Sequence, residues 1–186
     1  MDRSRMARLG ALALGAAGLA WGFKAGVILA KGDQPALAFE LGQVLFPTGI
    51  LGIVSTIKRP SRLARSGIAL AIVGVVGSVL ALGYPMLPGV YVPQGDAFVL
   101  PYSLFVLAAS LGGFLALVIV GLAVLRDGQS WGRWRRVPIV VGLSPVMFAA
   151  LGAVDIELPI LGIAAGWILL GAALWSVARS TGRAVG

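Results

Sequence analysis

The sequence predicts an all-α, polytopic integral membrane protein: a bundle of six transmembrane helices with both termini in the cytoplasm. Its 186 residues are 59% hydrophobic and only 12% charged, whereas soluble domains are about one-quarter charged. A crossing needs about 20 apolar residues, so this length allows six helices with short connections and makes residues 1–186 a single membrane domain. The expected spans are residues 9–30, 37–57, 67–87, 102–125, 137–154 and 159–178.

The first three spans are bounded by basic or turn-forming residues. The apolar run that follows Arg8 continues past Trp21, which is too long for the apolar core of a cleaved signal peptide. Pro47 stands in the middle of the second span and predicts a kink, because proline removes one backbone hydrogen bond. The third span is expected to end at the turn that begins with Gly83 and contains Pro85.

The last three spans carry small residues and a second proline. Ser110, Gly112 and Gly113 predict a close helix contact in the fourth span, because small residues let two backbones approach. The fifth span contains Pro145 and the sixth follows a short acidic turn at 155–157.

Positive charge marks one surface of the predicted bundle. Thirteen of the 15 basic residues fall at the ends of spans that would meet on the same side. The positive-inside rule then places both termini in the cytoplasm, with an even number of crossings between them. These residues are Arg3, Arg5, Arg8, Lys58, Arg59, Arg62, Arg65, Arg126, Arg133, Arg135, Arg136, Arg179 and Arg183.

Lys24 and Glu40 are the charges that hydropathy places inside the spans, one on each side of the short turn at 31–35. An isolated charge at that depth is unfavourable by about 2.5–3.5 kcal/mol. The two side chains would therefore form an ion pair or line one polar cavity that opens outward. The alternative is that Lys24 snorkels to the surface and Glu40 lies at the interface, each solvated separately.

Acidic residues gather on the opposite side from the arginines. Asp33, Asp155 and Glu157 would form, with Glu40 and Asp96, a cation site of oxygen ligands or a proton-coupling group. The alternative is a set of solvated loop charges. We expect no resident metal and no cofactor, because the chain lacks histidine and cysteine, the usual ligands of zinc, copper and haem.

The two prolines suggest a second candidate site. Pro47 and Pro145 occupy corresponding places if the second set of three spans repeats the first in inverted topology, and kinked helices often build the central site of a transporter. Thr48 and Ser144 stand beside them and would meet a freed backbone carbonyl or a substrate. Proline kinks are also common in membrane helices of every kind.

The connection between the fourth and fifth spans alternates tryptophan with arginine. Indole rings prefer the headgroup region and guanidinium groups attract anionic lipid phosphates. This pattern predicts contact with anionic lipid headgroups at the cytoplasmic face, or with a protein partner, and not with nucleic acid. The residues are Trp131, Arg133, Trp134, Arg135 and Arg136.

The sequence favours a small permease or transporter-like protein of a prokaryotic plasma membrane, with an outward-facing polar pocket. The first alternative is a non-catalytic accessory or regulatory membrane subunit that docks lipid or a partner through the Arg/Trp segment, and the partner would be another protein or a second copy of this chain. The second is a membrane-embedded enzyme acting on lipid, which we disfavour because the chain carries no nucleotide-binding loop, no nucleophile elbow and no zinc-binding histidine motif.

Overall fold

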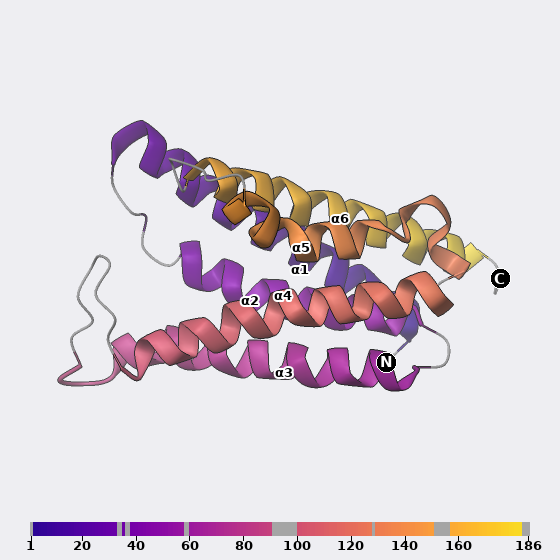
Figure 1. The fold of residues 1–186 in the computed structure, drawn as a ribbon, viewed down its shortest axis with the longest axis horizontal. Coiled ribbons are helices and arrows are strands. Elements are labelled where there is room, and N and C mark those ends of the chain that lie inside the picture. Colours follow the sequence, from indigo (N-terminus) through magenta and orange to yellow (C-terminus); the bar gives the residue numbers. More distant parts are fainter. Residues whose placement is uncertain are drawn as a thin grey trace.

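The computed structural model describes residues 2–32, 35, 38–57, 60–90, 100–127, 129–150 and 157–183, and this part of the chain is helical throughout its regular structure (Figure 1). It contains six α-helices in the expected order, which confirms the all-α class. They are α1 (Arg3–Lys31), α2 (Ala38–Ser55), α3 (Arg62–Gly83), α4 (Tyr102–Asp127), α5 (Val137–Ala150) and α6 (Glu157–Arg183). Two short 3₁₀ helices, η1 (Tyr84–Met86) and η2 (Gln129–Trp134), follow α3 and α4.

Two helices begin earlier than the apolar pattern predicts, because polar side chains cap them. The Asp2 carboxylate accepts from the Ser4 backbone N–H at the start of α1, and the Ser61 hydroxyl accepts from the Ala64 N–H at the start of α3. Capping extends each helix through the arginines that precede the apolar segment. Hydropathy finds the part of a helix inside the membrane and misses the turn that projects from it.

Five helices, α1, α2, α3, α4 and α6, are long and apolar enough to cross a membrane, and the chain is a multi-pass membrane protein. The described part of α5 has 14 residues, about 21 Å at the rise of an α-helix. Residues 151–154, where this span was expected to end, lie outside the described residues. Large apolar side chains such as Leu19, Phe23 and Leu111 are more than half exposed on the bundle surface, as lipid-facing residues are.

The helices pack in sequence order, and α6 returns to α1 to close the ring. The most extensive contacts join α1 to α6, α3 to α4, and α1 to α2 (Figure 1). Besides its neighbours α1 and α3, α2 also touches α4 and α6 across the ring. It is therefore the most central helix of the bundle.

Both chain ends lie at the same end of the bundle (Figure 1). We call this the basic end, because exposed arginines gather there from the chain start, the start of α3, the end of α4, η2 and the end of α6. These are Arg3, Arg5, Arg8, Arg62, Arg65, Arg126, Arg133, Arg135, Arg136 and Arg179.

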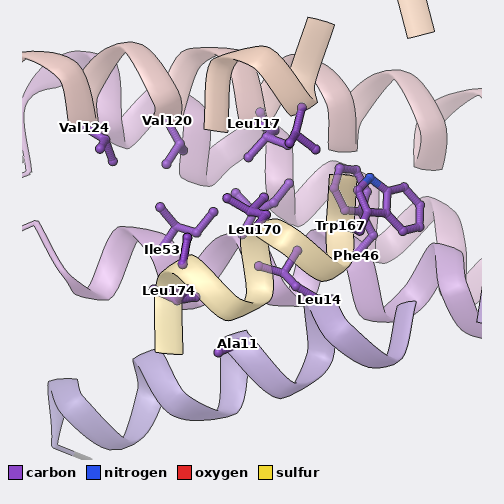
Figure 2. Close-up of a cluster of buried hydrophobic side chains, with 14 of the residues drawn as sticks. Ala11, Leu14, Phe46, Ile53, Leu117, Val120, Val124, Trp167, Leu170 and Leu174 are labelled. Carbon is purple, nitrogen blue, oxygen red and sulfur yellow. The ribbon is translucent and has the colours of Figure 1, made fainter. Parts of the chain in front are cut away.

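Glycine contacts hold the helix backbones close together, and the contact at Gly112 is one that the sequence predicts. A Cβ atom at Gly10 of α1 would lie 2.5 Å from the Gly52 Cα of α2, and one at Gly112 of α4 would lie 2.9 Å from the Gly74 nitrogen of α3. The space between the helices is filled by an apolar core that includes Leu14. Figure 2 shows its side chains from α1, α2, α4 and α6 meeting in one cluster.

Candidate functional site

A buried polar contact joins α2, α3 and α4 in the half of the bundle away from the basic end. Gln43 is only 5% exposed, and its Nε2 donates to the Ser110 hydroxyl oxygen at 3.0 Å. The Ser78 hydroxyl, itself buried, donates to the Gln43 backbone carbonyl at 2.8 Å. One residue of α2 is thus hydrogen-bonded through its side chain to α4 and through its backbone to α3.

Pro47 explains why the Gln43 carbonyl is available to another helix. In a regular helix this oxygen would accept from the backbone N–H four residues later, and proline has none. Pro47 is fully buried, so the carbonyl has no access to water and needs a partner from the protein. Ser78 supplies that partner, sharing its one proton with its own-helix Gly74 carbonyl at 2.7 Å.

Two ionisable groups lie beyond this contact, farther from the basic end. Glu40 stands one helical turn before Gln43 and is partly buried. Tyr102 stands in the first turn of α4, the helix whose Ser110 hydroxyl accepts from Gln43. We refer to Glu40, Gln43, Ser78, Tyr102 and Ser110 together as the polar junction.

Lys24 of α1 lies beside Phe39 of α2, the residue before Glu40. Its Nζ is 4.4 Å from the centroid of the Phe39 ring, a cation–π distance. Phe39 in turn stacks on Trp21, whose indole Nε1 donates to the Phe39 carbonyl at 3.2 Å. Lys24 and Glu40 therefore belong to adjoining parts of α1 and α2, and the ion pair between them stays a prediction.

An aromatic cluster extends inward from Phe39 and Trp21. The Trp21 ring lies 4.6 Å from that of Trp167 on α6, and Trp167 stacks face to face on Phe46 of α2 at 4.1 Å. Figure 2 shows the Trp167 and Phe46 rings together at one end of the apolar core. The Trp167 Nε1 is buried, and no hydrogen-bond acceptor for it exists among the residues that the structure describes.

The two hydroxyls expected at the kinks bond to carbonyls of their own helices. Ser144 donates to the Val141 carbonyl at 2.7 Å, which is the oxygen that Pro145 leaves without a backbone donor. Thr48 is exposed and donates to the Val44 carbonyl at 2.7 Å. The carbonyl freed by Pro145 is thus met by Ser144 of the same helix, whereas the carbonyl freed by Pro47 is met by Ser78 of α3.

The predicted outer acidic group falls mostly on residues that the structure does not describe. Asp33, Asp96 and Asp155 lie outside the described residues, and of Glu157 only the backbone, at the start of α6, is described. Among the described residues no three acidic side chains gather where they could hold a metal ion. The cation site thus remains a prediction.

The Arg/Trp segment forms the helix η2 and departs from the expectation at one residue. The Trp131 ring is 1% exposed, and its Nε1 donates to the Thr56 hydroxyl oxygen at 2.8 Å. This ring is therefore an anchor to the end of α2 and does not face headgroups. Trp134 is partly buried, and Arg133, Arg135 and Arg136 are exposed.

Compared with known proteins, the chain matches no family model, no curated protein and no solved structure.

Sequence reasoning missed Gln43 and Ser78, the central residues of the polar junction. A signal was present: Gln43 is an amide inside an apolar span, four residues before Pro47, at the position whose carbonyl the proline frees. The pattern predicts that this oxygen needs a partner but does not say which helix supplies it.

Proposed function

We propose that this chain is a small permease-like protein of a prokaryotic plasma membrane, with its basic end in the cytoplasm. In this proposal the polar junction receives a small polar solute from the opposite side. The observation that carries it is the hydrogen-bonded contact of Gln43 with Ser78 and Ser110, in which polar groups of three helices meet one turn before Pro47 of the central helix. Kinked helices with freed carbonyls at a polar site are the architecture of many secondary transporters.

The residues of the junction supply hydrogen-bonding groups that can replace the water around a polar solute. Glu40 and Lys24 stand nearest the opposite end and would attract a charged or dipolar solute. The Gln43 amide and the Ser110 hydroxyl then offer one donor and one acceptor each to replace water. Toward the basic end, Gly74 lies close against Gly112 and the Phe46 ring close against Gly113, so the helices are tightly packed there. Passage would require α2 to move away from α3 and α4.

Flux into proteoliposomes tests the proposal. We would measure influx of glycerol, alanine, ammonium and potassium into vesicles with the full-length protein and into protein-free vesicles. At least one probe should enter faster with the protein, and Glu40→Gln and Gln43→Leu should each reduce that rate at least about fivefold, the effect of roughly 1 kcal/mol. Thr48→Val is the matched control, because its hydroxyl bonds only to its own helix, and should retain the wild-type rate. Rates equal to those of protein-free vesicles for every probe would contradict transport of these solutes.

Orientation needs a separate measurement. The chain contains no cysteine, so Arg62→Cys and Arg133→Cys each introduce a single labelling site. A membrane-impermeant thiol reagent should label both from the cytoplasmic side. Labelling of the two positions from opposite sides would contradict the arrangement of helices itself.

A further inference from the structure

Two arginines at the basic end lie over tryptophan rings. The Arg133 Cζ is 5.0 Å from the centroid of the Trp134 ring in η2, and the Arg179 Cζ is 5.5 Å from that of Trp175 near the end of α6. Helix η2 packs against α6. Two arginine–tryptophan pairs from distant parts of the sequence thus occupy the same end of the bundle.

The bundle fixes both tryptophans. Trp134 and Trp175 are partly buried against the apolar core. Trp131, three residues before Trp134, is buried and hydrogen-bonded to Thr56, which ties η2 to the end of α2. The positions of the two guanidinium groups are therefore set by the fold more than those of arginines on free surface side chains.

When the face of a guanidinium group lies against an indole ring, the edge of the guanidinium stays free. The guanidinium is planar, so a ring contact on its face leaves N–H groups in the plane for two hydrogen bonds to one phosphate. Arg135 and Arg136 are exposed beside this pair and add positive charge. No acidic residue occurs between 128 and 154 or between 158 and 186, and the acid nearest to this segment in sequence is Asp127 at the end of α4.

We propose that the two arginine–tryptophan pairs bind the phosphate headgroup of an anionic phospholipid. The site lies where the spans α4 and α6 end, at the level where tryptophan prefers the membrane interface. Exposed apolar side chains on α5, among them Val140, Leu143, Val146 and Met147, lead away from the basic end and would receive the acyl chains. A lipid therefore fits this surface better than a soluble anion, which would use the charge and leave the apolar face uncovered.

Lipid-dependent thermal stability of the full-length protein in dodecyl maltoside tests this proposal. The probes are dioleoyl phosphatidylglycerol, dioleoyl phosphatidylcholine and inorganic phosphate, each titrated against the melting temperature, with native mass spectrometry counting bound lipids. Phosphatidylglycerol should stabilise the protein and remain bound, whereas phosphatidylcholine and phosphate should do neither. Stabilisation by phosphate equal to that by phosphatidylglycerol would overturn the lipid assignment.

Matched variants locate the site. Arg133→Gln and Arg179→Gln should each weaken phosphatidylglycerol binding about fivefold. Arg65→Gln removes an exposed arginine of the same end that contacts no ring among the described residues, and should change binding less than twofold. Equal losses of phosphatidylglycerol binding in all three variants would show that the basic end attracts the lipid by its overall charge and not through a specific site. If a glutamine variant does not fold, Arg133→Lys and Arg179→Lys keep the charge but lose the planar fork, and full retention of binding by both would also contradict the proposal.

Discussion

The two proline-containing helices solve the same problem in opposite ways. Pro47 in α2 and Pro145 in α5 each leave one backbone carbonyl without its helical donor. In α5 the carbonyl of Val141 accepts from Ser144, on the same helix. In α2 the carbonyl of Gln43 accepts from Ser78 on α3, which converts a local defect into a contact between helices.

This difference follows from where each helix lies. Pro47 is fully buried and its helix touches four others, whereas Pro145 is partly buried on a helix that packs mainly against α4 and α6. Side-chain hydrogen bonds join α2, or the residue that follows it, to α1, α3, α4 and η2. The same residue type is therefore compensated by a neighbouring helix in α2 and by its own helix in α5.

The largest expected effect comes from glycine substitutions that compare the contact of α2 with α1 and the contact of α5 with α6. Gly52→Ala places a Cβ 2.5 Å from the Gly10 Cα, a backbone contact that cannot relax without separating α1 from α2. It should lower the free energy of unfolding by about 3 kcal/mol. Gly166→Ala in α6 meets only the Val141 side chain of α5, at 3.4 Å or more, and should cost less than about 1 kcal/mol. Reversible unfolding in dodecyl sulfate, followed by tryptophan fluorescence, measures both, and equal losses would remove the distinction between the two interfaces.

Serine substitutions compare the two kinks directly. Ser78→Ala leaves the buried Gln43 carbonyl unpaired and should destabilise the protein by about 1–2 kcal/mol. Ser144→Ala breaks no contact between helices and should cost about half as much. Adding Pro47→Ala restores a backbone donor to the Gln43 carbonyl, so Ser78→Ala should cost less in that background. Additive losses in this double-mutant cycle would show that Ser78 does not compensate for the proline.

A side-chain amide substitution isolates the contact with α4. Gln43→Leu keeps the side-chain volume and the backbone carbonyl but removes the donor to Ser110. The expected loss of stability is about 0.6–1 kcal/mol, the usual value for a hydrogen bond between membrane helices. Ser110→Ala should cost a similar amount, and the double variant no more than either alone. The same unfolding titration measures the set, and a double variant equal to the sum of the singles would contradict the bond.

The smallest effect on stability is expected from titration of Asp2 at the start of α1. This turn is also held to α2 by Ser55, which donates to the Arg3 carbonyl at 3.3 Å. The Ser4 hydroxyl and backbone N–H donate to the Asp2 carboxylate and lower its pKa below the usual 3.8. A lowered pKa stabilises the folded end above pH 3.8, and this contribution is lost as pH falls through the lower folded value. The NMR chemical shift of the Asp2 side-chain carboxyl carbon should titrate below pH 3.8. Amide hydrogen exchange in the first turn of α1 should become faster as this carboxylate is protonated. Asp2→Asn keeps a capping oxygen and should show no such pH dependence.

The sequence indicates polar residues near the prolines, but it does not identify Gln43 and Ser78 as the residues that bond between helices. It points to Lys24 and Glu40 on two helices that a short turn joins, and the ion pair or shared cavity between them stays a prediction. It also expects the hydroxyls beside the prolines to meet freed carbonyls or a substrate, and the Ser144 hydroxyl bonds to the Val141 carbonyl. It assigns Thr48 to the kink of α2, yet Thr48 is exposed and Gln43 is the residue with partners on other helices. Helical phase decides which of the two faces inward, and an almost uniformly apolar span carries little information about phase.

By itself, the sequence determined the class of the protein and the order of its helices. Transfer of apolar segments into lipid depends on the composition of each segment alone, so it can be read along the chain without knowing any neighbour. Tertiary structure alone decided that α2 is central, that Trp131 is an anchor, and that Gln43 finds partners 35 and 67 residues away. Those partners depend on how helices approach across the bundle, where glycine contacts and side-chain shape set distances that no local pattern contains.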